Sequence, residues 1–309
     1  MNYLIGLDIG TSSVKGVLMT EDGRVEKTAH GAFNYTALEN GGLEIEADTF
    51  ASVCIGAIRE LAKSAKGAGK GICASSASGN LVVLDKENRP VTPIFNWQDK
   101  RVTTEAEEIL GAMDLDAFYK QTGWPFSYKT FPLALLCYVK KHEPEKIENC
   151  GMACMSTEYL YYKLTGQWGI STSAGTTFYL IDQKTGTYIP ELLEKIGITE
   201  KQLPPVMPCG TVLGGITAEI SEACGLPIGT PVVLGTFDHP SAARGVGVLE
   251  EGQMLLSCGT SWVGFFPVKS REKIEQAKTL IDPFLSPNGG PWRGPGRRGR
   301  DRLRRIRRR

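Results

Sequence analysis

The sequence predicts an α/β protein built around a mixed β-sheet. Short apolar, β-branched runs alternate with longer segments whose apolar residues recur at helical spacing, and this mixture is typical of α/β folds. The 309 residues suggest two domains on a scale of about 150 residues each. With 41% hydrophobic and 22% charged residues, the chain has material for a buried core and lacks the composition of a disordered or fibrous protein.

Three short strands are predicted to open the chain as a meander. Their runs cover residues 3–9, 14–19 and 24–28, with turn residues at 10–13 and 21–23 between them. Asp48 is placed to cap a helix over residues 49–64, whose apolar side chains share one face. Residues 71–76 and 81–85 indicate two further strands.

The rest of the chain mixes both patterns. Helical spacing covers residues 102–110, 115–121, 133–141, 157–164 and 216–224, and small residues open another helix at 240–243. Strand patterns cover residues 177–182, 231–235, 253–258 and 262–267. The last two predict a hairpin around residues 259–261.

An internal repeat indicates duplicated domains. The tripeptide Gly-Thr-Ser occurs at residues 10–12 and again at 259–261, each time between two strand-like runs. We therefore expect a first domain over residues 1–248 and the start of a second, incomplete domain over 249–288. Residues 289–309 form an Arg-rich tail.

This tail distorts the charge of the chain. It holds ten arginines and one acid, so without it the 35 basic and 34 acidic side chains become 25 and 33, a net charge of −8. An acidic body is not expected of a general nucleic-acid binder. Because the composition changes abruptly after Asn288, we interpret the tail as out-of-frame translation or a disordered end; its functional alternative is a tether to nucleic acid or another anionic surface.

The cysteines indicate a reducing compartment. All eight are scattered, mostly in apolar stretches, and the N-terminus lacks the layout of a signal peptide. We expect buried free thiols and a cytoplasmic protein. The three histidines give no second ligand pair for Cys150 and Cys154, which argues against zinc. The longest apolar run, over residues 131–139, is too short for a membrane span.

The turn after the first strand has the residue types of a phosphate site. Asp8 ends the strand, and the backbone amides and hydroxyls of Gly10, Thr11 and Ser12 can converge on phosphate oxygens. Asp8 can hold Mg²⁺ through water, and Lys15 on the next strand can add a positive charge. An ordinary hairpin turn explains the same spacing.

Asp238 is the candidate catalytic acid. It follows the buried strand over residues 231–235 and precedes a helix, which is where open α/β sheets bind ligands. A helix cap is the structural alternative for this carboxylate. His239 is expected to be a packed or exposed neighbour.

Four separated motifs carry a family resemblance: GLDIGTSSVK at residues 6–15, NWQDKR at 96–101, GTFD at 235–238 and LSCGTS at 256–261. In this order they resemble the FGGY carbohydrate kinases, over residues 1 to about 288. The resemblance implies an actin/Hsp70/hexokinase-like fold of two RNase H-like domains with the active site between them. The first domain is expected to contain a mixed five-stranded sheet, and this chain is expected to contain only the beginning of the second domain.

The resemblance also implies roles for individual residues. Asp238 matches the general base that takes the proton of the attacking hydroxyl, and Asp8 matches the Mg²⁺-organising acid, with Asp238 as a second metal-facing carboxylate. The first phosphate loop corresponds to Gly10, Thr11 and Ser12, with Lys15 nearby, and the second to Gly259, Thr260 and Ser261. Segments that contact the polyol correspond to Ser78, Gly79 and Asn80 and to Trp97 and Asp99. A base, a metal-binding acid and two phosphate loops suffice for phosphoryl transfer, which depends mainly on positioning and charge neutralisation.

The expected function is ATP- and Mg²⁺-dependent phosphorylation of a sugar or polyol, with a ketose such as xylulose favoured. The chain departs from many ketose kinases, which carry Met-His-Gly near residues 78–80, and from glycerol kinases, which carry glutamine at the position of His239. The segment that binds adenine in the family lies beyond this chain, so we expect weak or no activity from it. A non-catalytic sugar-binding fragment is the alternative, and an Arg-tail nucleic-acid binder ranks third. The expected partners are a small sugar or polyol and a second copy of the chain in a homodimer.

Overall fold

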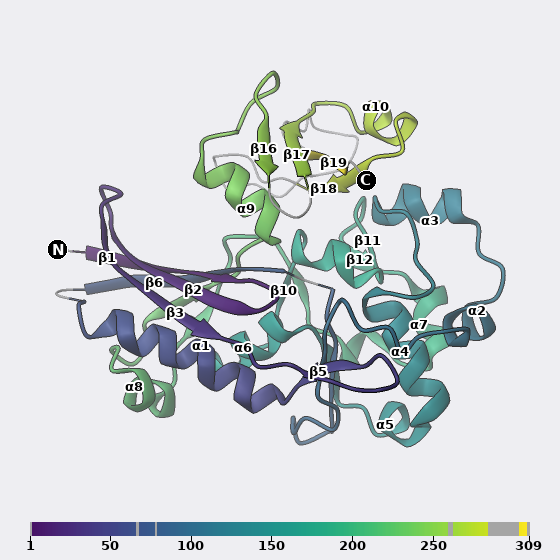
Figure 1. Ribbon diagram of the computed structural model, residues 1–309, viewed down its shortest axis with the longest axis horizontal. Coiled ribbons are helices and arrows are strands. Elements are labelled where there is room, and N and C mark those ends of the chain that lie inside the picture. The colour runs from purple at the N-terminus through teal and green to yellow at the C-terminus, as the bar shows by residue number, and fades with distance from the viewer. Residues whose placement is uncertain (1, 66–67, 78, 259–261, 284–302, 308–309) are drawn as a thin grey trace.

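The computed structural model describes residues 2–65, 68–77, 79–258, 262–283 and 303–307. Within these residues a six-stranded mixed sheet forms the centre of the larger lobe, in the order β14-β15-β6-β1-β2-β3 (Figure 1). Its strands are β1 (Asn2–Ile9), β2 (Ser13–Thr20), β3 (Val25–Ala32), β6 (Ala68–Ser76), β14 (Val212–Gly215) and β15 (Pro231–Val233).

The sheet combines a meander with parallel strands. β1, β2 and β3 pair antiparallel in sequence order, which confirms the predicted meander. β6 and β15 are added parallel to β1, and β14 pairs antiparallel with β15. The expected five-stranded sheet is therefore corrected to six strands. β14 went unpredicted because it is a four-residue edge strand that contains two glycines and an irregular register, and so lacks a clear alternating pattern.

One face of the sheet is covered by helices α1 (Ala47–Ala62), α6 (Ser156–Thr165) and α8 (Ala218–Cys224). Alternate residues of β1, from Tyr3 to Ile9, are buried on this side. The predicted cap of α1 is wrong. Glu46 is the N-cap, and Asp48 lies in the first turn, where its carboxylate accepts a hydrogen bond from the hydroxyl of Tyr159 at 2.7 Å.

A second core lies beside the sheet and is largely helical (Figure 1). It contains α2 (Glu105–Leu110), α3 (Leu115–Thr122), α4 (Phe131–His142), α5 (Pro144–Glu148), α7 (Pro190–Ile196) and the 3₁₀ helices Ala174–Phe178 and Glu200–Gln202. The short strands are β4 (Thr36–Ala37), β5 (Leu43–Ile45), β7 (Val82–Leu84), β8 (Ile94–Phe95), β9 (Met152–Cys154), β10 (Ile170–Ser171), β11 (Ile181–Asp182), β12 (Thr187–Tyr188) and β13 (Val206–Met207). The predicted strand over 177–182 is wrong in its first part. Its apolar run reflects burial of Phe178, Tyr179 and Leu180 and not strand geometry, since Tyr179 adopts a φ of 65°.

Helix α9 (Asp238–Gly245) leads into a smaller lobe (Figure 1). There β16 (Leu255–Cys258) pairs antiparallel with β17 (Trp262–Pro267), as predicted for the second hairpin. α10 (Arg271–Gln276), β18 (Leu280–Asp282) and β19 (Leu303–Arg307) complete this lobe. β19 falls in the tail, residues 289–309, for which disorder or a shifted reading frame is expected, and both interpretations of the tail stay predictions.

The expectation of buried free thiols is met for most of the cysteines. All eight cysteines are free, and six are buried, but Cys73 and Cys258 are exposed. In the described part of the chain, every helix is too short or too polar to cross a bilayer.

Candidate functional site

Three parallel strands bring the two candidate carboxylates to one edge of the sheet. Asp8 pairs in register with Ser75 of β6, and the next residue, Ser76, bridges Phe237 beyond the end of β15. The carboxyl ends of β1, β6 and β15 therefore coincide. Because neighbouring strands are about 4.8 Å apart, the backbones at Asp8 and Asp238 are separated by two strand spacings, about 10 Å.

The closeness of the backbones at this edge depends on a glycine. A Cβ on Gly235 would lie 1.9 Å from the carbonyl oxygen of Ala74, so only glycine lets the chain after β15 approach β6 this closely. The buried hydroxyl of Tyr161 joins the same two segments. It donates to the Ala74 carbonyl at 3.1 Å and accepts from the Gly235 amide at 3.1 Å.

The turn after β1 is tight and partly open to solvent. The amide of Gly10 donates to the Ser13 carbonyl at 2.9 Å, and the carbonyl of Ser12 accepts from the Phe33 amide at 2.8 Å. Ser12 is exposed, and Lys15 lies directly opposite Asp8 in the register of β1 and β2, with both side chains exposed. A Cβ on Gly10 would meet its nearest neighbour at 3.4 Å, an ordinary contact, so the turn itself does not require glycine.

The NWQDKR segment reaches the same turn. The indole Nε1 of Trp97 donates to the Thr11 hydroxyl at 2.9 Å, which joins a predicted polyol residue to a predicted phosphate residue. Asp99 has a different environment, because its side chain is fully buried. It accepts hydrogen bonds from the Leu43 amide at 2.9 Å and from the guanidinium of Arg101 at 2.8 Å.

Arg101 completes this buried cluster. It also pairs with Glu44 at 2.9 Å and lies over the ring of Phe95 at 4.3 Å. The structure thus gives Asp99 an internal role: together with Arg101 it holds the loop that carries Trp97. Direct contact of the Asp99 carboxylate with a polyol does not fit these contacts.

Two described residues of the 78–80 segment are also structural. Gly79 adopts a φ of 98°, and a Cβ there would lie 2.6 Å from the ring of Phe131. Asn80 is buried, and its Oδ1 accepts the amide of Ser156 at 2.6 Å, which satisfies one of the unpaired amides at the start of α6. Ser78 and the second predicted phosphate loop, Gly259, Thr260 and Ser261, lie outside the described residues.

Asp238 is the first residue of α9 and not its cap, which is Phe237. Its side chain is 28% exposed, and its Oδ1 accepts the amide of His239 at 2.6 Å. His239 packs against aromatic rings, with its imidazole stacked on Phe265 at 5.3 Å, as expected of a packed neighbour. Asp238 is thus partly exposed at the start of α9, and its carboxylate accepts one of the first amides of that helix.

Sequence reasoning missed Ser173, which touches this site through the backbone. Its hydroxyl accepts the amide of Phe237 at 3.2 Å. A single serine within a Thr-Ser-Ala-Gly run has no periodic or motif signal, so only the tertiary contact reveals it.

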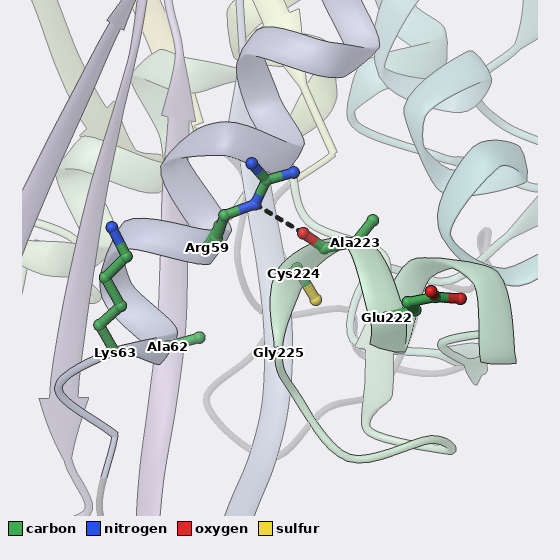
Figure 2. A pocket seen from close by; sticks show the side chains of 7 residues that line it. All are labelled: Arg59, Ala62, Lys63, Glu222, Ala223, Cys224 and Gly225. Carbon is green, nitrogen blue, oxygen red and sulfur yellow. Dashed lines mark hydrogen bonds between the residues drawn. The ribbon is translucent and has the colours of Figure 1, made fainter.

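A pocket of about 390 Å³ lies elsewhere, between the C-terminal ends of α1 and α8 (Figure 2). Both helix ends precede the starts of parallel strands, so this pocket is at the sheet edge opposite Asp8 and Asp238. Its arginine, Arg59, donates to the Ala223 carbonyl at 2.6 Å, and Lys63 pairs with Glu60 at 2.5 Å. These cations are occupied, and the helix ends present carbonyl groups, so the pocket has no features of an anion site.

Comparisons with known proteins agree with this geometry. The family model for the N-terminal domain of the FGGY family of carbohydrate kinases matches residues 3–245. The autoinducer-2 kinase of Yersinia pestis (strain Pestoides F) is 27% identical over 304 residues, covering 96% of this chain and 55% of that protein. The chain therefore spans about half the length of the curated relatives it matches.

Solved structures show the same fold. The xylulose kinase of Rhodospirillum rubrum superposes with a TM-score of 0.87 at 25% identity, over 99% of this chain and 60% of that one. The ADP complex of Plasmodium falciparum glycerol kinase gives 0.83 at 16% identity, over 99% and 61%. The predicted actin/hexokinase-like fold is confirmed.

Proposed function

The chain belongs to the FGGY family of carbohydrate kinases, and from this premise we propose that it serves the ATP-dependent phosphorylation of a sugar or polyol hydroxyl. The observation that carries the proposal is the shared sheet edge of the Asp8 turn and Asp238. A ketose is the favoured acceptor, in keeping with the name of the xylulose kinase relative. The name of the autoinducer-2 kinase relative makes autoinducer-2 the second acceptor to test.

In this proposal Asp238 is the general base. Its partly exposed carboxylate accepts the proton of the substrate hydroxyl as that oxygen attacks the γ-phosphate. The amides and hydroxyls of Gly10, Thr11 and Ser12, with Lys15, hold phosphate oxygens, and Gly259, Thr260 and Ser261 are proposed for the same task on the second loop. Trp97 and the 78–80 segment border the acceptor, while Asp99 and Asn80 keep those segments in place.

The carboxylates fit a magnesium ion that arrives with the nucleotide. In the described part of the chain, no three His, Cys, Asp or Glu side chains gather closely enough to hold a metal by themselves. Mg²⁺ commonly binds through one or two carboxylates together with substrate phosphates and water. Asp8 would hold the ion through water, and Asp238, whose backbone is about 10 Å from that of Asp8, would face it from the end of β15. When bound, the ion neutralises charge on the phosphates.

A sugar panel with coupled detection of ADP tests the proposal on a version of the chain extended to the full length of its relatives, because weak or no activity is expected of the 309 residues alone. Asp238→Asn is expected to abolish turnover and to leave sugar binding within about threefold, because the base acts only in the chemical step. Asp22→Asn, an exposed acid in the turn before β3, is the matched control and keeps full activity. Full turnover in Asp238→Asn would remove this residue as the base.

The second candidate function is non-catalytic sugar binding by the residues present here, which span 55% of the length of the curated relative. Calorimetry with the sugar and with ADP separately distinguishes the two. Binding of sugar without nucleotide supports the second function. We further propose a cytoplasmic location, a homodimer and no nucleic-acid partner; a DNA affinity that falls steeply with salt would contradict the last.

A further inference from the structure

A segment of the small lobe returns to the large lobe and makes hydrogen bonds with it. We name residues 271–282, which comprise α10 and β18, the return strap. The amide of Ile281 donates to the Gly123 carbonyl at 2.9 Å, and the Ile281 carbonyl accepts from Trp124 Nε1 at 2.9 Å and from Gln183 Nε2 at 3.0 Å. Arg271, which is 6% exposed, donates to Gln183 Oε1 at 3.0 Å. The strap is thus fixed by buried hydrogen bonds at both ends.

The last residue of the strap begins a chain of hydrogen bonds that leads to α9. Asp282 is 4% exposed, and its two carboxylate oxygens accept from the Ser173 hydroxyl at 3.1 and 2.9 Å. The same hydroxyl accepts the amide of Phe237 at 3.2 Å. A hydroxyl that donates to a carboxylate becomes a better acceptor, so the two bonds strengthen each other in a buried setting. The chain ends one residue before Asp238.

The position of Phe237 determines that of Asp238. Phe237 is the N-cap of α9, and its side chain offers no oxygen to satisfy the first helical amides. Its backbone is instead held by the bridge to Ser76 on one side and by Ser173 on the other, and its ring contacts Trp124, with centroids 6.0 Å apart. Any movement of this peptide moves the carboxylate that follows it. In an active site a displacement of about 1 Å can cost about 100-fold in rate.

We propose that Ser173 and Asp282 are positioning residues for Asp238, and that through them the return strap couples the placement of the small lobe to the orientation of the base. This inference rests on the proposed function of Asp238. It requires no contact of Ser173 or Asp282 with the substrate.

Amide hydrogen exchange tests the coupling without any need for activity. Ser173→Ala and Asp282→Ala are each expected to speed exchange at the Phe237 amide by at least about tenfold, the equivalent of one lost hydrogen bond. Asp282→Asn keeps an acceptor oxygen and is expected to restore most of the protection. Tyr119→Phe is the matched control: it removes the hydroxyl that donates to the strap carbonyl of Thr279 at 2.7 Å and leaves the exchange at Phe237 within about twofold.

Asp282 reaches the Phe237 amide through the Ser173 hydroxyl, so the Asp282→Ala result is decisive. Unchanged exchange at Phe237 in this variant overturns the proposal, even if Ser173→Ala speeds it. Should Asp282→Ala fail to fold, Asp282→Asn and Ser173→Ala still decide: the first must retain protection and the second must lose it.

Kinetics with the sugar that the wild type phosphorylates test the consequence for the base. Ser173→Ala and Asp282→Ala are expected to lower kcat by about 100-fold with KM for the sugar within about threefold, and the double variant to be no worse than the poorer single variant. The proposal is overturned if KM for the sugar rises by the same factor by which kcat falls, or if an active variant keeps the wild-type kcat. A wild-type protein extended to the full length of its relatives that consumes no ATP with any sugar refutes the proposed function alone, and the exchange result still decides the coupling.

Discussion

Replacing Glu158 with glutamine is expected to change how stability depends on pH. Glu158 lies in the first turn of α6 and is fully buried, and neither of its carboxylate oxygens has a hydrogen-bond partner in the described part of the chain. Burial raises the pKa of Glu158 from 4.5 to about 8, against the opposing effect of the nearby backbone amides of Glu158 and Met155. The folded protein therefore holds this side chain neutral at pH 7.

The sign and size of the effect follow from proton linkage. Between pH 4.5 and about 8 the folded state binds this proton and the unfolded state does not. The free energy of unfolding therefore falls as pH rises, by about 1.4 kcal/mol per pH unit, to at most about 4 kcal/mol between pH 5 and 8. Glu158→Gln is neutral in both states and lacks this slope. The variant should match the wild type near pH 5 and exceed it increasingly toward pH 8.

Urea unfolding followed by tryptophan fluorescence at pH 5, 6, 7 and 8 measures this difference. Glu105→Gln is the control: its difference from the wild type should stay constant from pH 5 to 8, because Glu105 titrates below that range. Burial opposes ionisation of Glu105, but hydrogen bonds from His142 and from the amides of Thr103 and Thr104 outweigh it and lower the pKa of Glu105 to about 2. Its stabilisation is present above pH 4.5 and is lost as pH falls toward 2. Parallel curves for Glu158→Gln and the wild type from pH 5 to 8 would refute a protonated Glu158.

Three further substitutions test the packing behind the site. Gly235→Ala places a methyl group 1.9 Å from a backbone carbonyl oxygen of β6 and should destabilise by about 3 kcal/mol in urea unfolding, whereas Gly56→Ala, in an uncrowded helical position, should stabilise by up to about 1 kcal/mol. Gly10→Ala should change the free energy of unfolding by less than about 1 kcal/mol, because the turn has room for the added methyl group. The same methyl group would occupy the proposed approach of the phosphate and should weaken ADP binding at least about tenfold in calorimetry. Equal ADP affinity would contradict a phosphate role. Arg101→Ala leaves Asp99 buried without its guanidinium and should cost about 3 to 5 kcal/mol by thermal unfolding, and a loss under about 1 kcal/mol would contradict the internal role assigned to the pair.

The main parts of the fold were predictable because their signals are local. β1, β2 and the buried strand before Asp238 show mostly apolar patterns bounded by turn residues, and β3, which is mostly exposed, follows a clear turn signal. Parallel pairing then places the ends of β1, β6 and β15 at one edge, so the position of the candidate site follows from strand direction alone. By contrast, β14 could not be predicted, since a short glycine-containing edge strand resembles a loop.

The roles of the acidic residues were harder to predict, because the sequence shows the same residue type whether the carboxylate contacts a ligand or an arginine of the protein. The resemblance places Asp99 in a segment that contacts the polyol, whereas Arg101, only two residues away, indicates a buried ion pair. No such signal existed for Asp282, whose partner Ser173 lies 109 residues earlier in the chain. Contacts of that span follow from the assembled fold.

The structure joins motifs that the sequence presents separately. The bond from Trp97 to Thr11 ties the loop held by Asp99 and Arg101 to the turn after β1. Asn80 ties the neighbouring segment to the start of α6, and Ser173 ties α9 to the return strap. Among the described residues, the Trp97 loop, the segment at Asn80 and the start of α9 are thereby each fixed by a buried side chain that need not touch the ligand. Substitutions of these supports should impair turnover more than binding, because they shift the orientation of groups that remain present.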